Sequence, residues 1–552
     1  MIRHWFKSGS PWIWLTASAV SVNMILVFGL LVFIAIRGLG HFWPSEVVAL
    51  DYVGADGAKV SLIGEINDQE KVTVARLHDA GVDVPGNSGD LVTRYLIKTG
   101  NRDVSGADFR WIVAPNIQAR HVPKTLVTLE RREWGNFYGE LLAVRENGKL
   151  VSDGKAAWDA LQERLQRANN IFDDIRVVEK SDIGSINYGL ERIRLKERKL
   201  ELDKDEDPAK HAALAKQRAE LQAKYEGLQT RLRNLYQSIN RDSMDMVIAD
   251  GRTIEIPLAK VVRAYRPNSM SLMEKIGFYM AKVWEFVSDE PREANTEGGI
   301  FPAIFGTVMM VIIMSIMVVP FGVVAAVYLR EYAKQGPLTR LIRIAVNNLA
   351  GVPSIVYGVF GLGFFVYFLG GNIDQLFFPE ALPAPTFGTP GIMWASLTLA
   401  LLTVPVVIVA TEEGLSRIPK AIREGSLALG ATKAETLWRT VLPMASPAIM
   451  TGLILAIARA AGEVAPLMLV GVVKLAPSLP LDGNAPFLHL DRKFMHLGFH
   501  IYDVGFQSPN VEAARPLVYA TAFLLVLVIV ILNLAAITIR NRLREKYRAL
   551  EG

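Results

Sequence analysis

Two charged residues, Arg459 and Glu463, stand inside an apolar run that is long enough to cross a bilayer. Four residues separate them, so a helix would carry both on one face. An ionised side chain at that depth is costly unless it is paired or wet, which makes the two residues candidates for function. A guanidinium stays charged and its fork fits tetrahedral oxyanions, so Arg459 is a candidate anion ligand that Glu463 holds and neutralises. The alternative is a structural ion pair between two spans.

The segment just before this run predicts two short helices with a corner between them. Residues 424–429 and 433–441 are rich in helix formers, and Gly430 between them reaches backbone angles that other residues avoid. Pro443 cannot continue a helix interior, so we expect the second helix to end there. The whole loop, about residues 411–446, would be a rigid lever. The alternative is a surface hairpin that only joins two spans.

The spacing of Glu424, Gly430, Leu442 and Pro443 resembles the EAA motif of ABC importer permeases, the cytoplasmic loop that docks on an ATPase. The wider wording, EGSLALGATKAETLWRTVLP followed by ARAAGEVAPL, is similar to the PstA-type permeases of phosphate ABC transporters. The segments PREANTEGGIFPAIFGT, NLAGVPSIVYG and SLPLDGNAPFLHL are similar to the same family, so the resemblance covers about Pro291 to Ile539.

This resemblance implies a type I ABC importer subunit in a bacterial inner membrane. It implies three partners: a PstC-like permease, a PstB-like ATPase dimer that binds the ATP, and a periplasmic phosphate-binding protein. It also implies that Arg459 takes part in phosphate passage. The sequence departs from the motif where Gly425 and Ser426 follow Glu424, and where Thr440 replaces the usual isoleucine. Gly425 weakens its helix by up to ~1 kcal/mol, and neither change removes the docking role.

Composition predicts a polytopic membrane protein. Of the 552 residues, 51% are hydrophobic, and apolar runs of about 20 residues, the length that spans a hydrocarbon core, recur along the chain. Six spans are predicted, at Trp12–Ile36, Phe301–Leu329, Ile344–Leu369, Ile392–Ala410, Pro447–Val472 and Leu517–Ile539. We therefore expect an all-α membrane protein with six transmembrane helices and an α+β insertion outside the cytoplasm.

Lys and Arg gather at alternate flanks of the spans. They are Arg3 and Lys7, then Arg330, Lys334, Arg340 and Arg343, then Arg417, Lys420, Arg423, Lys433 and Arg439, and finally Arg540, Arg542, Arg544, Lys546 and Arg548. Between the third and fourth spans stand Asp374 and Glu380 with no Lys or Arg. The positive-inside rule places both termini and the Glu424 loop in the cytoplasm.

The chain divides into residues 1–43 with the first span, a polar insertion at 44–299, and a permease core at 300–552. In the insertion, apolar residues alternate around Asp-Gly and Asn-Gly turns, which predicts strands. The predicted strands are Val47–Val53, Lys59–Ile66, Leu91–Lys98, Phe109–Val113, Lys124–Leu129, Leu141–Arg145, Leu150–Val151, Met246–Ala249 and Thr253–Ile256.

The middle of the insertion, about residues 155–240, predicts an antiparallel helical hairpin. Leu214, Leu221, Leu228 and Leu235 recur every seven residues, as in a coiled-coil seam. A helix at about 188–202 precedes them across a break at 203–208. The hairpin is either an arm that touches a partner or a hairpin packed on its own β domain. Residues 263–297 then return the chain to the membrane with aromatic residues suited to the interface.

The third predicted span opens with NNLAGVPSIVYG. Asn348 and Ser354, beside Gly351 and Pro353, predict a loosened helix that faces either a cavity or another helix. Both residues join Arg459 and Glu463 as candidate pathway residues.

Several classes are excluded by what the sequence lacks. There is no cysteine, so disulfides and cysteine-ligated metals are excluded. The net charge of +5 is spread along the chain and leaves no nucleic-acid footprint. There is no G-x-x-x-x-G-K-[ST] sequence, so ATP hydrolysis belongs to another subunit. We expect a transport subunit without cofactor or catalytic residues.

Three histidines, His489, His496 and His500, lie in the loop before the last span. We expect a solvated surface loop; the spacing of the last two leaves a metal site as the alternative. Two other functions compete with phosphate import. One is a permease for another oxyanion such as molybdate or sulfate, and the other is a membrane sensor with residues 44–299 as its receptor.

Overall fold

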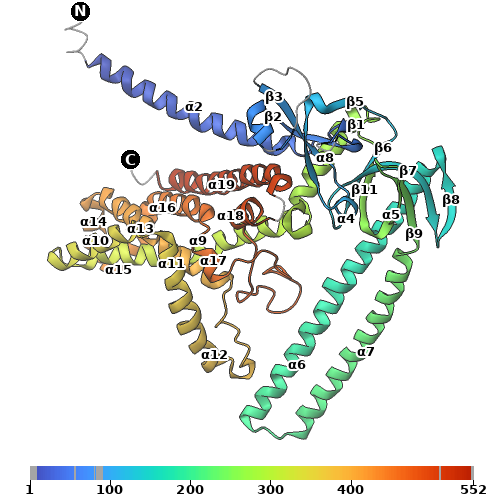
Figure 1. The fold of residues 1–552 in the computed structure, drawn as a ribbon. Coiled ribbons are helices and arrows are strands. Elements are labelled where there is room, and N and C mark those ends of the chain that lie inside the picture. Colours follow the sequence, from blue (N-terminus) through green and yellow to red (C-terminus); the bar gives the residue numbers. More distant parts are fainter. Residues whose placement is uncertain (1–8, 55–56, 80, 83–90, 509–510, 549–552) are drawn as a thin grey trace, which may run out of the picture. The chain divides into compact units, whose positions relative to one another are not determined.

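The computed structural model describes residues 9–54, 57–79, 81–82, 91–508 and 511–548 (Figure 1). The chain forms two compact units. The membrane unit comprises the residues up to 41, 286–290 and those from 299 onward, and the insertion unit comprises 42–285 and 291–298. Arg3 and Lys7 lie outside the described residues.

Six helical segments of the described chain are long and apolar enough to cross a membrane. They are Pro11–Gly40, Phe301–Tyr332, Ser354–Phe377, Ile392–Arg417, Lys433–Gly462 and Ala514–Glu545. The prediction of six membrane helices is confirmed. Their main helices are α2 (Ser10–Gly40), α9 (Phe301–Val327), α11 (Ser354–Phe360), α13 (Ile392–Arg417), α16 (Leu442–Gly462) and α19 (Val511–Arg548). Shorter helices connect them: α10 (Pro337–Leu349), α12 (Gly371–Phe377), α14 (Lys420–Ala428), α15 (Lys433–Thr436), α17 (Leu467–Val470) and α18 (Leu497–Tyr502).

The third span begins ten residues later than predicted, at Ser354 instead of Ile344. Residues 350–353 separate α10 from α11. A proline disfavours the helical conformation in the residue before it, and Pro353 directly precedes α11. α10 is amphipathic and ends before the break, so the apolar residues from Ile344 to Leu349 belong to a separate helix.

α13 is the most enclosed of the six spans, with 67% of its apolar window buried inside the protein. Close approach of small residues fixes its neighbours. A Cβ on Gly414 would lie 2.4 Å from the Cβ of Ala448, and a Cβ on Gly452 would lie 2.8 Å from that of Ala410. Membrane helices pack through such small residues because lipid supplies no hydrophobic drive between helices. α16 is therefore seated firmly against α13.

In the described part of the insertion unit, antiparallel strands form two large sheets and one small sheet of β12 (Pro291–Arg292) and β13 (Glu297–Gly298). The first has the order β4-β3-β2-β1-β5, from Phe109–Val113, Leu91–Lys98, Lys59–Thr73, Val47–Val53 and Ile117–His121. The second has the order β10-β9-β7-β6-β11, from Thr253–Pro257, Asp242–Val247, Phe137–Glu146, Leu126–Arg131 and Val261–Tyr265, with β8 (Lys149–Asp153) paired to β7. The strands β5 and β11 were not predicted. Small elements complete the unit: α3 (Val74–Asp79) and α4 (Arg102–Ser105).

The predicted helical hairpin is present (Figure 1). Its first arm joins α5 (Ala157–Arg176) to α6 (Gly184–Asp203) through a π-helical turn, and its second arm is α7 (Pro208–Ile239). α5 packs on the second sheet through Leu161 and Leu165, which are buried with strand residues such as Val144. The hairpin is thus rooted on its own β domain through α5.

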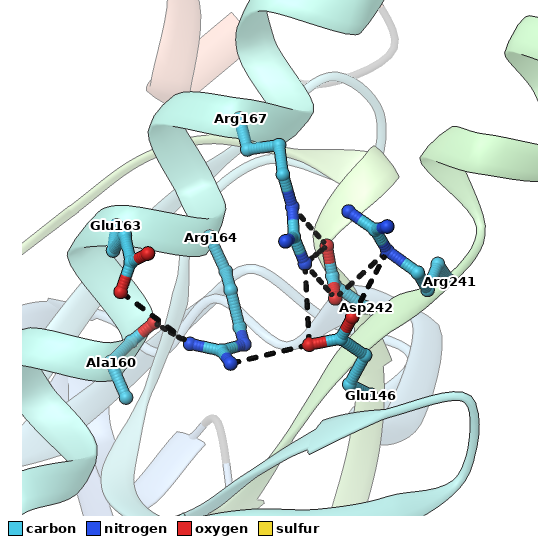
Figure 2. Close-up of polar contacts among 7 residues, drawn as sticks. All are labelled: Glu146, Ala160, Glu163, Arg164, Arg167, Arg241 and Asp242. Carbon is cyan, nitrogen blue, oxygen red and sulfur yellow. Dashed lines mark hydrogen bonds and ion pairs between the residues drawn. The ribbon is translucent and has the colours of Figure 1, made fainter.

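An ion cluster joins α5 to the second sheet (Figure 2). Arg167 on α5 contacts both oxygens of Asp242, at 2.6 and 2.7 Å. Arg164 also reaches from α5 to Glu146 at 3.2 Å, and Arg241 lies 3.5 Å from Glu146. The hydrogen bond to Asp242 raises the pKa of Arg167 above its usual value.

Candidate functional site

The predicted corner is present between α14 and α15. Gly430 has a φ of 89°, in the left-handed region that glycine enters without steric cost. Thr432 and Glu435 then form a reciprocal capping box that begins α15. A 2.9 Å hydrogen bond between the hydroxyls of Ser426 and Thr436 ties the two helices together. The serine at this motif position therefore has a structural role, because its side chain links the two helices of the corner.

The corner is anchored to the ends of the spans. Arg423 donates to the carbonyls of Leu415 and Ile418 at 2.7 and 2.8 Å and pairs with Glu331 at 3.0 Å. Lys433 donates to the carbonyl of Glu331 as well. Sequence reasoning missed Glu331, although an acidic residue in the basic loop between the second and third spans is a usable signal. These contacts attach the corner to the ends of the second and fourth spans.

The outer face of the corner is apolar and open. Leu429 is 91% exposed and Trp438 is 70% exposed. Leu427, on α14 and near Leu429 in the sequence, has nearly half of its surface exposed. Glu424 is exposed too, whereas Leu442 is half-buried beneath the corner against a buried cluster that includes Val441. Apolar side chains that remain exposed on an anchored corner are suited to contact with another protein.

The expectation that Pro443 ends a helix is wrong. Pro443 is the second residue of α16, and α15 runs into α16 through a π-helical turn at Leu437–Val441. Proline lacks the N–H that an α-helical hydrogen bond needs, and the wider π-helical turn just before Pro443 does not require that bond. Proline is also tolerated at the start of a helix. One helical run therefore extends from Lys433 to Gly462.

Arg459 lies in the last turn of α16, and Glu463 is the residue after its end. The two were predicted to share a helix face, but Glu463 has an extended backbone because the helix ends at Gly462. Arg459 Nε still lies 3.8 Å from Glu463 Oε1. A positive charge in this turn is also favoured by the negative end of the helix dipole.

The second polar contact of Arg459 is the carbonyl of Ala350, which accepts from it at 3.4 Å. Ala350 opens the break between α10 and α11, so the arginine meets the loosened segment that the sequence predicts. Asn348 is exposed at the end of α10 and Ser354 begins α11. Among the described residues neither side chain is hydrogen-bonded to Arg459. The structure thus brings Arg459 and Glu463 together with the break, but not with those two side chains.

Arg459 is poorly satisfied for a charged group in a membrane span. A guanidinium carries five N–H donors, and the described residues give it one ion pair at 3.8 Å and one carbonyl at 3.4 Å. Its side chain is 31% exposed. The structure shows no partner for its other donors among the described residues.

The expected solvated histidine loop is wrong. His489, His496 and His500 are all buried. His489 lies 3.0 Å from Asp482, and His496 accepts from the N–H of Gly498 at the start of α18. Burial lowers the pKa of His496 to about 3 and that of His500 to about 4, so both rings are neutral at pH 7. The described residues contain no cluster of three metal-ligating side chains.

Comparison with known proteins identifies relatives of the membrane unit. The family model of binding-protein-dependent transport system inner membrane components matches residues 318–548. The phosphate transport system permease protein PstA of Mycobacterium leprae is 36% identical over 225 residues, 40% of this chain and 68% of that protein. PstA 1 of Mycobacterium tuberculosis strain H37Rv is 36% identical over 247 residues, 44% of this chain and 70% of that protein. A probable PstA of Methanocaldococcus jannaschii is 31% identical over 221 residues, 39% and 67% of the two chains.

Proposed function

Because the chain belongs to the PstA-type permeases of binding-protein-dependent ABC importers, we propose that it carries inorganic phosphate inward across a bacterial inner membrane. In this proposal both termini and the corner at Gly430 are cytoplasmic. A PstC-like permease completes the pathway, a PstB-like ATPase dimer docks on the corner, and a periplasmic phosphate-binding protein delivers the anion. This chain is a transport subunit without cofactor, and the ATP is bound by its partner.

One observation carries the proposal: the docking corner and Arg459 belong to the same helical run, Lys433–Gly462. At 1.5 Å per residue, about 39 Å of continuous helix separates Lys433 from Arg459. In Figure 1, α14 and α15 lie at one end of α16 and α17 lies at the other. A displacement of the corner therefore moves the arginine with it.

The contacts of Arg459 support a gated anion site. Its partners are the break at Ala350 and the carboxylate of Glu463, and these belong to different segments. When ATP closes the ATPase dimer, the run from Lys433 shifts against the third span, and the anion contacts of Arg459 open to one side or the other. Glu463 competes with the anion, which keeps binding weak enough for release.

The test is phosphate uptake into vesicles that contain the assembled complex, normalised to the amount of complex. Arg459→Gln is expected to abolish uptake. Arg459→Lys is expected to retain only part of it, because lysine keeps the charge and loses the fork. The matched control is Arg417→Gln, which removes the arginine of an exposed pair with Glu413, also four residues apart; it is expected to keep uptake.

The double variant Arg459→Gln with Glu463→Gln separates a substrate role from a structural one. Removing both partners of a structural pair leaves no unpaired charge, so recovered uptake would refute the anion role. Direct uptake of labelled phosphate, molybdate and sulfate decides the anion. Uptake of molybdate or sulfate without uptake of phosphate would refute phosphate as the substrate.

A further inference from the structure

The helix α8 (Leu272–Ser288) presents apolar side chains outward and charged side chains inward. Its outward row is Leu272, Ile276, Met280 and Trp284, with Met273 beside it; we call these five residues the α8 stripe. All five are between 43% and 78% exposed. At about 100° per residue the stripe covers about 120° of the helix and extends about 18 Å along it.

The opposite face of α8 carries a buried ion network within the insertion unit. Glu285 accepts from Arg263 at 3.0 Å and from Arg292 at 2.8 Å. Lys282 lies 3.2 Å from Glu285 and donates to Glu130 at 2.9 Å. These hydrogen bonds fix the rotation of α8 about its axis, so the stripe cannot turn inward without breaking them.

This arrangement is the reverse of what water selects. A helix on the surface of a soluble domain directs its apolar side toward the core and its charges toward solvent. A contiguous apolar patch that a domain leaves exposed marks contact with a partner or a membrane. The exposed charge on α8 is Glu274 in its first turn, where it accepts from the N–H and hydroxyl of Ser271. The medium around the stripe must therefore be apolar.

The chain connections specify that medium. The first span ends at Gly40, and three residues later the ring of Trp43 lies 6.0 Å from that of Tyr279 on α8. Three residues reach at most about 11 Å, so the chain that links the end of the first span to this contact of α8 is short. Asn268, just before α8, exchanges two hydrogen bonds with the backbone of Val47. The second span then begins at Phe301.

We propose that α8 lies in the outer leaflet of the bilayer, at the boundary between headgroups and acyl chains, with the α8 stripe in lipid. Tryptophan is favoured at this depth because its ring is apolar and its N–H is polar. Amphipathic helices bind this boundary through their buried apolar area. The α8 contact is a lipid contact of the insertion unit, and it does not depend on which anion the membrane unit carries.

The absence of cysteine from the natural chain allows a direct test. Ile276→Cys, Met280→Cys and Trp284→Cys are labelled separately with an environment-sensitive nitrobenzoxadiazole dye in the full chain. The protein is reconstituted in vesicles of phosphatidylcholine and phosphatidylglycerol. The vesicles contain nitroxide-bearing lipid with the quencher either near the headgroup or near the end of the acyl chain. Two labelled variants are controls: Ile316→Cys, exposed on α9 within a span, and Leu150→Cys, exposed on β8.

All three α8 labels are expected to lose fluorescence, and to lose more with the shallow quencher than with the deep one. Ile316→Cys should lose more with the deep quencher, and Leu150→Cys should lose none. Adding Met280→Glu to the Trp284→Cys protein should reduce its quenching, since a carboxylate on the stripe disfavours lipid. Quenching of the α8 labels no greater than that of Leu150→Cys would refute the proposal and show that protein or water covers the stripe. Stronger deep quenching would refute the interfacial depth.

Discussion

The ion cluster of the insertion unit and the arginine pair of the membrane unit use the same side chains in opposite ways. Arg167 holds Asp242 with two short contacts, and the carboxylate side chain is only 2% exposed (Figure 2). Arg459 and Glu463 stand 3.8 Å apart and both remain partly exposed. The two arginines are about equally exposed, at 36% and 31%, so the pairs differ in their carboxylates and in their geometry. The Arg167 pair is short and bidentate on a buried carboxylate, whereas the Arg459 pair is longer and its carboxylate is 22% exposed.

The difference between the two pairs lies in how many N–H donors of the arginine are already used within the protein. In the insertion unit Arg167 directs its donors at the buried Asp242, although Arg241 in the same cluster reaches Glu146 and Asp242 only at 3.5 and 3.7 Å. The membrane unit holds Arg459 in place with the helix end and the Ala350 carbonyl and leaves donors free. If Arg459 has the proposed role, variants at Arg167 should change stability and variants at Arg459 should change uptake.

The largest effect is expected when the tight cluster is broken. Arg167→Gln leaves the buried Asp242 with Arg241 at 3.7 Å as its remaining arginine contact among the described residues. We expect the free energy of opening β9 to fall by about 3 kcal/mol, as for other buried pairs that lose one partner. Amide hydrogen exchange of β9 in the full chain measures it. Arg459→Gln should change the protection of α16 by less than about 1 kcal/mol. Equal losses at the two sites would break the comparison.

The second prediction asks whether the His500 ring, a buried group of the membrane unit without a hydrogen-bond partner among the described residues, carries a stability cost. His500 is neutral when folded, with its pKa lowered to about 4 by burial, from 6.5. Between these values the unfolded chain binds a proton that the folded protein excludes, so the free energy of unfolding falls as the pH falls. From pH 7 to pH 5 the loss from this ring is about 2 kcal/mol.

Thermal unfolding of the complex across this pH range measures the effect, with His500→Gln as the variant that cannot titrate. The variant should retain the part of the pH dependence that His496 contributes and lose the part from His500. An unchanged slope would mean that the region around α18 opens before the ring is protonated.

The third prediction moves from charges to the corner that positions Arg459. Gly430→Ala places a Cβ in open space but in a left-handed conformation, at a cost of about 1–2 kcal/mol. Such a cost changes a two-state population about five- to thirtyfold. We expect phosphate uptake per ATP hydrolysed to decrease by about the same factor, while the complex still assembles. Normal coupling in this variant would leave the corner as a simple connector.

The smallest effect is expected at Gly425, which serves as the matched control for Gly430. A Cβ there also meets open space, but the residue is inside α14. Gly425→Ala should stabilise the helix by about 0.5–1 kcal/mol. Uptake should be unchanged and the protection of α14 amides should rise. A loss of coupling in both alanine variants would attribute the effect to the added methyl on the surface of the corner instead of the backbone conformation.

Hydropathy predicted that there are six membrane helices because a span is a long, local signal, but it placed the fifth at Pro447–Val472 and the structure has it at Lys433–Gly462. The break before α11 was missed as a boundary because Ile344–Leu349 is apolar enough to look like part of a span. Local rules also failed at Pro443, where a π-helical turn accommodates the proline. The strands β5 and β11 lack a hairpin turn of their own and pair with distant strands, so their sequence signal is weak.

The site was predictable in its residues but not in its contacts. Arg459 was identifiable from its charge within an apolar run, whereas its carbonyl partner at Ala350 depends on tertiary packing. The burial of His496 and His500 was predicted wrongly although their neighbours Met495, Leu497 and Phe499 are apolar, because the histidines were weighed as polar loop residues. α8 showed its aromatic residues in the sequence, but only the ion network around Glu285 reveals which face is outward.

The π-helical turn at Leu437–Val441 also determines how far α16 is rotated about its axis relative to the corner. A π-helical turn holds more residues than an α-helical one, and each residue corresponds to about 100° about the helix axis. Deleting one residue from this turn would leave the corner on the ends of the spans and rotate Arg459 away from the Ala350 carbonyl. Not even one residue can therefore be inserted or deleted between Lys433 and Arg459 without moving the arginine, even where individual side chains can be exchanged.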